Sequence, residues 1–279
     1  MSAAGTTTAS SASYLAHFGL GGAPFVKEIG DTDLWLPPSK VEIVDGLVEA
    51  ADERENGLLV GEPGAGKTCV LRALRQRLQG PRYRLTYNHN STLGKRDFYR
   101  QLCVALGLTP SATAAAVFYA VSTHVQQLGQ DRVHPVFLLD EAHLLHPDTL
   151  DHLHILLNYE WDSRALLSLV LVGLTDLVDR LELRRHRSLY SRISRRFVIS
   201  PLTAEDTADY LRFRLKLAGC ERDLFADEAK GLLHEHAQGT LRDLDRLATA
   251  GLREATKRKR KVVAAEDIDR VALLAAGAP

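Results

Sequence analysis

The sequence predicts an α/β fold with a parallel sheet covered by helices on both faces, followed by a small all-helical domain. Three observations support this prediction. A strand, a glycine-rich loop and a helix follow one another early in the chain, strand and helix patterns then alternate, and no strand pattern occurs after Pro201. Alternating strands and helices give parallel strands because each helix returns the chain to the same end of the sheet. We expect a disordered tail over 1–13, an α/β domain over 14–200 and a helical domain over 201–279.

The first strand is predicted over 57–60, and the hydrophobic patterns place the other elements. Further strands are expected at 83–87, 135–139, 167–172 and 197–199. Helices of the first domain are expected at about 41–48, 69–78, 95–106, 112–127 and 149–159, with a short helix after 172. The helical domain is predicted to contain helices at 204–217, 226–236, 241–255 and 264–274.

The loop after the first strand fits the phosphate-binding pattern G-x-x-x-x-G-K-[ST] at every constrained position. Its residues, together with the one that follows, are Gly61, Glu62, Pro63, Gly64, Ala65, Gly66, Lys67, Thr68 and Cys69. Glycines let successive backbone N–H groups turn toward phosphates, and the start of the next helix adds partial positive charge. We predict that these residues bind ATP, that Lys67 reaches the β- and γ-phosphates, and that the Thr68 hydroxyl is a ligand of Mg²⁺.

A second motif follows the strand expected at 135–139. Four apolar residues lead directly into Asp140 and Glu141, which is the pattern of a Walker B element. A buried strand can deliver one carboxylate to Mg²⁺ and the next to the attacking water, so we assign Asp140 to the metal and Glu141 to the water. A plain strand end is the simpler explanation of such a pattern, but its place about 70 residues after a phosphate loop favours the functional interpretation.

Composition excludes several other classes of protein. The chain has 279 residues, and its 35 basic and 35 acidic side chains cancel, so a polyanion site would have to be a local patch. Three scattered cysteines predict neither a disulfide framework nor a zinc site, and His152 and His154 are too closely spaced to share a helix face. The N-terminus lacks an export signal and the apolar run at 165–174 is too short to span a membrane. A cytoplasmic protein is expected.

A phosphate loop, a Walker B element and a helical C-terminal domain together resemble the AAA+ P-loop ATPases. Within this class the chain is similar to the ExeA/GspA-type secretion ATPases and to the TnsC-, IstB- and MuB-like transposition ATPases. The segments that carry this narrower resemblance are 14–15, 17–20, 24–25, 140–145, 156–160, 172–173 and 191–193. The resemblance implies an ATP site completed by a neighbouring subunit.

Several further site residues follow only from this resemblance. It implies an arginine finger acting in trans within the arginine-rich segment 180–196, with Arg192 as the best match and Arg195 and Arg196 as alternates; the simpler explanation for most of these arginines is a solvated basic edge. It also implies that Arg242 reaches the γ-phosphate as a sensor 2 residue. At the sensor 1 position related sequences have a polar residue where this chain has Leu174, so Thr175 is expected to replace it.

The resemblance leaves two branches open, and a membrane segment separates them. ExeA-type relatives are expected to continue into such a segment, whereas this chain ends at Pro279, which favours the transposition branch. We then expect a homo-oligomeric ring or helical filament that assembles on double-stranded DNA with ATP and recruits a transposase, without contacting a membrane. The alternative is an ATPase that assists assembly of a secretion complex. A third possibility is a replication-initiator-like DNA loader.

The expected DNA contacts are Ser91, Thr92, Lys95 and Arg96, which follow the second strand. Hydroxyl and cationic side chains suit phosphate contacts that carry no base specificity. The alternative for this segment is an ordinary helix start capped by Ser91 or Thr92. The basic run 257–261 is a second possible contact, with a solvated charged loop as its alternative.

Overall fold

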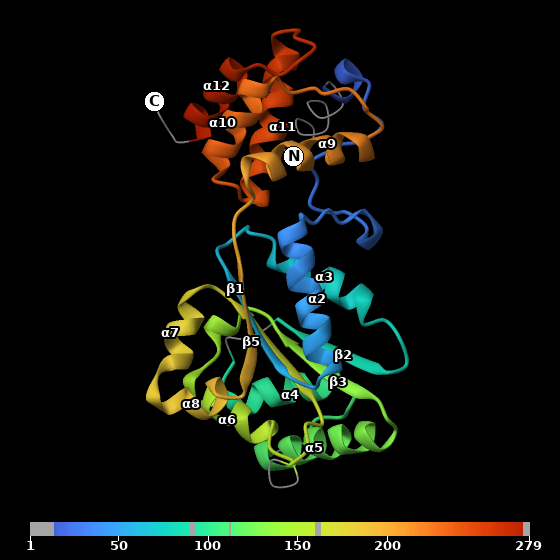
Figure 1. Ribbon diagram of the computed structural model, residues 1–279, viewed down its shortest axis with the longest axis vertical. Helices are drawn as coiled ribbons and strands as arrows, with labels where there is room; N and C mark the ends of the chain where they lie inside the picture. The colour runs from blue at the N-terminus through green and yellow to red at the C-terminus, as the bar shows by residue number, and fades with distance from the viewer. Residues whose placement is uncertain (1–13, 90–92, 112, 160–162, 276–279) are drawn as a thin grey trace, which may run out of the picture. The chain divides into compact units, whose positions relative to one another are not determined.

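The structure is a computed structural model that describes residues 14–89, 93–111, 113–159 and 163–275. A five-stranded sheet forms the centre of the α/β part (Figure 1). Its strands are β1 (Asn56–Gly61), β2 (Tyr83–Asn88), β3 (His134–Leu139), β4 (Ser168–Gly173) and β5 (Ile193–Ile199). They lie in the order β2-β3-β4-β1-β5, and every neighbouring pair is parallel. The carboxyl ends of all five strands therefore lie at one edge of the sheet.

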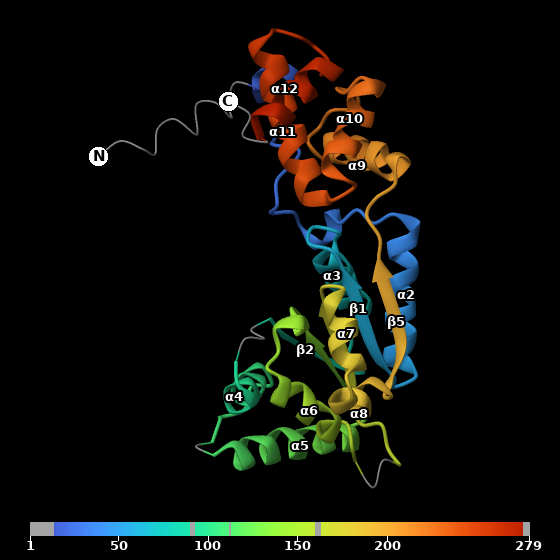
Figure 2. The same ribbon diagram turned by 90° about the vertical axis from the view of Figure 1, so that its left-hand side faces the viewer.

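Helices cover both faces of this sheet. On one face, α2 (Pro38–Asp52) contacts β1 and β5, and α3 (Lys67–Arg77) contacts β1. The two helices also contact each other. The other face carries α4 (Lys95–Ala105), α5 (Ala114–Gln130), α6 (Pro147–Leu156), α7 (Asp176–Glu182) and α8 (Arg187–Tyr190). The described residues before Ser200 also include the short 3-10 helices η1 (Asp31–Asp33), η2 (Ala142–Leu144) and η3 (Arg184–His186). Figure 2 shows α2 on the side of the sheet opposite α4, α5 and α6.

The position of each strand in the sheet explains how well the sequence predicted it. All residues of β3 and β4 are buried, so both strands are continuous apolar runs and were predicted to within one residue at each end. The edge strand β5 alternates between buried and exposed residues and contains Ser194, Arg195 and Arg196. Only its last three residues gave a strand pattern, because an edge strand keeps polar side chains on its solvent side.

The described chain divides into two compact units. One comprises Pro38–Glu62 and Lys67–Ile199 and is called here the α/β unit. The other comprises Met1–Pro37, Pro63–Gly66 and Ser200–Pro279, of which 1–13 and 276–279 lie outside the described residues; it is called the helical unit. The sequence analysis assigned residues 14–37 to the α/β domain, whereas the structure groups them with the C-terminal helices.

The helical unit contains the four C-terminal helices that the sequence predicted. They are α9 (Ala204–Leu217), α10 (Asp227–Ala237), α11 (Leu241–Lys257) and α12 (Ala265–Ala275). Tyr14, Phe18 and Phe25 are buried in the same apolar core as these helices. This burial explains why the N-terminal segment belongs to this unit.

A buried arginine fixes the same segment. The Arg214 side chain on α9 is 3 % exposed and donates hydrogen bonds to the backbone oxygens of Pro24 (2.7 Å) and Val26 (2.6 Å). It also donates to the hydroxyl of Tyr210 (2.9 Å), which in turn donates to Asp245 (2.6 Å). Buried polar groups are stable only when they are hydrogen-bonded, so Arg214 and the N-terminal segment depend on each other.

Candidate nucleotide site

The predicted site residues of the α/β unit gather at the carboxyl edge of the sheet. Lys67 and Thr68 of the phosphate loop begin the helix after β1, Asp140 and Glu141 follow β3, and Thr175 lies two residues after β4. Because β1 lies between β4 and β5, with β3 next to β4, these strand ends are close neighbours. Ligands of open parallel sheets bind outside the carboxyl ends of the strands. This edge is therefore the candidate nucleotide site.

The phosphate loop has the backbone that its glycines permit. Gly64 and Gly66 have φ angles of 82° and 103°, in the region that residues with a Cβ rarely adopt. Lys67 begins α3, and its ammonium group donates to the backbone oxygens of Gly61 (2.6 Å) and Glu62 (3.1 Å). The Lys67 side chain is thus directed along the loop, while Thr68 is exposed at the first turn of the helix. Cys69 is partly buried, in contrast to the buried Cys103 and Cys220.

The two carboxylates after β3 have different surroundings. Asp140 is 6 % exposed, and its Oδ1 accepts the backbone N–H of Glu141 (2.9 Å). The Glu141 side chain is 48 % exposed, and its backbone has a left-handed φ of 53°. Such a conformation is uncommon for a residue with a Cβ and is often found at functional sites. Asp140 is buried and hydrogen-bonded, which fits its predicted role as a metal ligand. Glu141 is exposed, so water can reach its carboxylate.

Tyr87 adds a contact that the sequence analysis did not anticipate. Its hydroxyl on β2 donates to Oδ2 of Asp140 (2.8 Å). Burial, followed by the hydrogen bond and the negative charge of Asp140, raises the pKa of the Tyr87 hydroxyl above its usual value. The hydroxyl is therefore a donor at neutral pH. The one sequence signal for Tyr87 is its position as the last residue of the strand predicted at 83–87.

His143 connects the Walker B segment to the end of β4. Its Nδ1 lies 3.5 Å from Oε2 of Glu141 and accepts the backbone N–H of Leu174 at 3.4 Å. A Cβ on Gly173 would lie 3.2 Å from the backbone nitrogen of His143 and 3.3 Å from its Nδ1. The glycine at the end of β4 therefore allows the close approach of His143.

Thr175 lies at the same edge, and its hydroxyl contacts the phosphate loop. It donates to Oε1 of Glu62 at 2.8 Å. Leu174, at the position where a polar sensor residue was expected, contributes only its backbone N–H to the contact with His143. The replacement of sensor 1 by Thr175 stays a prediction.

The oxygen donors at this edge fit a magnesium ion. Magnesium prefers oxygen ligands, keeps several waters, and usually takes only one or two protein ligands besides phosphate oxygens. The Thr68 hydroxyl and the Asp140 carboxylate match that requirement. No cluster of three or more His, Cys, Asp or Glu side chains suited to a metal occurs among the described residues, so a site built entirely from such side chains is not found there.

The three candidate arginine fingers differ in their contacts. Arg195 on β5 donates to Glu55 (2.6 Å) and Glu53 (2.5 Å); these hydrogen bonds raise the pKa of Arg195, and the Arg195 guanidinium lowers the pKa of Glu55. Arg196 stacks on the ring of Tyr190 at 3.8 Å. Arg192 donates to the backbone oxygen of Ser188 at 2.8 Å. Arg195 is thus held by carboxylates, whereas Arg192 donates to a neutral carbonyl.

Arg180 belongs to the same arginine-rich segment but has a local structural role. From α7 it donates to the backbone oxygens of His143 and of Leu145, the latter at 2.6 Å. These carbonyls lie in and just after η2, directly beyond the Walker B carboxylates. Arg180 therefore holds the segment that follows Glu141.

The remaining predicted site residues lie elsewhere. Ser91 and Thr92 are outside the described residues. Lys95 and Arg96 are exposed in the first turn of α4, whose N-cap is Gly94 rather than Ser91 or Thr92. Arg242 is exposed near the start of α11 in the helical unit. Its role as sensor 2, and the role of Lys95 and Arg96 as DNA contacts, stay predictions.

The basic run 257–261 is largely neutralised within the helical unit. Arg258 lies within salt-bridge distance of Glu254 (3.4 Å) and Asp267 (3.4 Å). Arg260 pairs with Glu266 (2.7 Å) and also with Asp267. This pattern agrees with a charged loop bound to its own protein.

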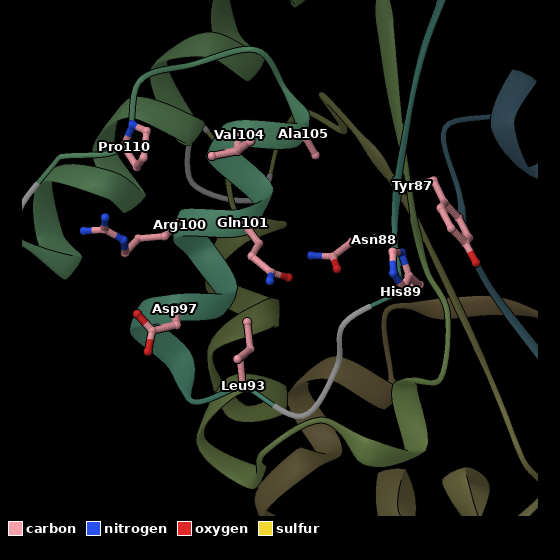
Figure 3. A pocket seen from close by; sticks show the side chains of 10 residues that line it. All are labelled: Tyr87, Asn88, His89, Leu93, Asp97, Arg100, Gln101, Val104, Ala105 and Pro110. Atoms are coloured by element: carbon pink, nitrogen blue, oxygen red, sulfur yellow. The ribbon is translucent and has the colours of Figure 1, made fainter. Parts of the chain in front are cut away.

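A cavity of about 590 Å³ lies beside the candidate site, between the end of β2 and α4. Asn88 and Gln101 point toward one another across it, whereas Arg100 extends from α4 in the opposite direction to Gln101 (Figure 3). The full lining comprises Tyr87, Asn88, His89, Leu93, Asp97, Arg100, Gln101, Val104, Ala105 and Pro110. Lys95 and Arg96 do not line it.

Comparisons with known proteins agree with this geometry. Residues 50–181 match the family model described as AAA domain. The chain is 32 % identical over 222 residues to General secretion pathway protein A of Aeromonas hydrophila. The aligned region covers 79 % of this chain and 40 % of that protein. The chain therefore spans about two fifths of the length of this relative.

Solved structures at lower identity share the fold. Cdc6p of Pyrobaculum aerophilum has a TM-score of 0.67 at 20 % identity, covering 87 % of this chain and 70 % of that one. The ORC1 protein of Aeropyrum pernix, solved in complex with DNA, has a TM-score of 0.64 at 22 % identity, with 87 % and 66 % coverage. The RuvB branch migration motor of Thermotoga maritima has a TM-score of 0.59 at 17 % identity, with 91 % and 73 % coverage.

At these identities the solved structures establish the fold alone. The parallel sheet flanked by helices and the C-terminal helices agree with the predicted fold class. The chain therefore has the fold of the AAA+ P-loop nucleoside triphosphatases, and its residues 50–181 match an AAA domain.

Proposed function

We propose that the chain binds ATP with Mg²⁺ and hydrolyses it. The observation that carries this proposal is the arrangement at the sheet edge: the phosphate loop follows β1, the buried Asp140 and the exposed Glu141 follow β3, and these two strands flank β4. Lys67 positions the phosphates, and Thr68 and Asp140 hold the metal. The metal neutralises phosphate charge when it is bound. Glu141 orients or deprotonates the attacking water.

Hydrolysis is proposed to require assembly of several copies of the chain. Arg192 is our choice for the residue that one copy supplies to the ATP of its neighbour, because it is the best match to the arginine of the related Ser-Arg-Ile segment. A cation supplied by a neighbour stabilises charge in the transition state. Arg242 is proposed to sense the γ-phosphate, and Thr175 to act at the sensor 1 position.

For the cellular role we propose an ATPase of the GspA type that assists assembly of a secretion complex. The support is the 32 % identity to General secretion pathway protein A over most of this chain. The sequence analysis preferred a role in transposition, with DNA and a transposase as partners, because of where the chain ends. The relative at 32 % identity has a secretion name instead, and the similarity to DNA-bound structures is one of fold.

No helix among the described residues combines the length and the apolar character that crossing a bilayer requires. We propose that the ATPase acts on the cytoplasmic side of the secretion complex. Its substrate would then be an envelope protein assembly, and duplex DNA would not be needed for turnover.

The enzymatic part is tested by ATP turnover and nucleotide binding of purified protein. Lys67→Ala should abolish both, because it removes the cation directed along the phosphate loop. Arg77→Ala is the matched control, since Arg77 lies on the same helix but pairs with Asp45 at the surface. Equal turnover by wild type and Lys67→Ala would disprove the proposed ATPase.

The cellular role is tested in a strain that lacks the gene. Secreted proteins in the medium, and the assembled secretion complex in the envelope, should be lost in the deletion strain. Wild type should restore them, and Lys67→Ala should not. Normal secretion by the deletion strain, together with ATP-dependent and salt-sensitive sedimentation of the protein on duplex DNA, would instead favour the transposition role.

A further inference from the structure

We propose that Tyr87 is a positioning residue that holds the metal-binding carboxylate of Asp140 and thereby sets the magnesium affinity of the nucleotide site. This inference deepens the proposed function and rests on it. Both carboxylate oxygens of Asp140 have a donor, the Tyr87 hydroxyl at Oδ2 (2.8 Å) and the backbone N–H of Glu141 at Oδ1 (2.9 Å).

The strand register places Tyr87 where it can act on the metal site. In the β2–β3 pair Tyr87 lies opposite Leu138, two residues before Asp140. Side chains alternate along a strand, so Tyr87 and Asn88 belong to opposite faces. Figure 3 shows Tyr87 directed away from Asn88 and from α4.

The face to which Tyr87 points also contains the second expected metal ligand. Tyr87 and Thr68 line the same cavity of about 190 Å³. One tyrosine therefore borders the cavity of Thr68 and hydrogen-bonds Asp140. The sequence places these three residues in separate segments, and the fold brings them to a single site.

The hydroxyl matters because the carboxylate is buried and has other possible partners. Arg72 and Arg75 of α3 line the same cavity as Tyr87, and their cations could attract a carboxylate that is free to rotate. Two fixed donors keep Asp140 oriented when the metal arrives. Hydrogen-bond partners of metal ligands commonly change metal affinity by about 10- to 100-fold when they are removed.

The test compares Tyr87→Phe, which removes only the hydroxyl, with wild type. A fluorescent ATP analogue is titrated with magnesium, and manganese binding in the presence of ATP is measured by electron paramagnetic resonance. Tyr83→Phe is the matched control, because Tyr83 lies on the same strand and donates to Asp52, a carboxylate outside the site. We expect Tyr87→Phe to raise the half-saturating magnesium concentration by about tenfold and Tyr83→Phe to change it by less than about twofold.

Metal-free affinity for the analogue distinguishes positioning from a change of fold. It should be the same in wild type and in Tyr87→Phe, since the phosphate loop is untouched. Unchanged magnesium dependence in Tyr87→Phe, or an equal loss of metal-free affinity, would overturn the role of Tyr87 while leaving the nucleotide function in place. Absence of nucleotide binding by wild type at every magnesium concentration would overturn the proposed function itself and this inference with it.

Discussion

The α/β unit and the helical unit are stabilised in different ways. In the α/β unit, buried strands such as β3 and β4 form an apolar core, and the chemical groups follow the strand ends. In the helical unit, a buried arginine on α9 binds backbone oxygens of a segment about 190 residues earlier in the sequence. The first arrangement depends on motifs that are continuous in the sequence, and the second depends on a long-range contact.

This difference shows where the sequence is informative. A phosphate loop or a Walker B element carries its chemistry within a few residues, so the pattern alone identifies the site. Arg214 lies in an amphipathic helix and gives no sign of its partners at Pro24 and Val26. The predictions below separate the two units experimentally, beginning with the largest expected effect.

Glu141→Gln should abolish most hydrolysis and leave nucleotide binding intact. Loss of a general base lowers rates by about 10²- to 10⁴-fold, and glutamine keeps the shape of the side chain. Turnover and the affinity for a fluorescent ATP analogue measure the two effects, with the exposed Glu205→Gln as control. Retention of more than about a tenth of the wild-type rate would remove Glu141 from its proposed role.

Arg214→Met should destabilise the helical unit by about 3 kcal/mol, because it leaves buried carbonyl oxygens and the Tyr210–Asp245 pair without their donor. Trp35 packs against the core of this unit and reports its unfolding. Urea titrations in a Trp161→Phe background, where Trp35 is the remaining tryptophan, measure the change. Arg212→Met, on the exposed side of the same helix, should shift stability by less than about 0.5 kcal/mol.

The α/β unit should lose stability in acid through His134. Burial, and then the charges of Arg54 and Arg82, lower the pKa of His134 to about 4. The unfolded chain binds a proton near pH 6.5, so the contribution of neutral His134 is complete above that pH and is lost as the pH falls toward 4. The loss is about 3 kcal/mol.

His134→Gln should reduce this pH dependence, because glutamine does not titrate and can still reach the Ser168 hydroxyl. Urea unfolding at pH 7 and at pH 4.5 measures it, and His124→Gln on α5 is the control in the same unit. An unchanged pH dependence in His134→Gln would contradict the assignment.

Thr175→Ala should have the smallest effect, a loss of hydrolysis of up to about tenfold, since its observed hydrogen bond to Glu62 is exposed. Thr175→Ser keeps the hydroxyl and should retain activity. Turnover at saturating ATP is the measurement. A loss beyond about 100-fold in Thr175→Ala alone would indicate direct contact with the reacting phosphate, as expected of a sensor 1 residue.

Much of the fold was predictable because its signals are local. The alternation of strands and helices predicted the five strands and the four C-terminal helices, four of the strands to within one residue at each end. The edge strand β5 was predicted too short, because Arg195 and Arg196 interrupt the apolar pattern. Spacing likewise predicted the phosphate-loop and Walker B residues, and their roles stay predictions.

The sequence by itself determined the α/β class, the phosphate loop and the two carboxylates after β3, because glycine geometry and strand burial impose those residue types locally. Tertiary structure alone decided that Tyr87 binds Asp140, that His143 packs against Gly173, and that the N-terminal segment joins the C-terminal helices. The physical reason is that such contacts depend on strand order and on the three-dimensional path of the chain. Neither the strand order nor the path of the chain leaves a periodic pattern in the sequence of these residues.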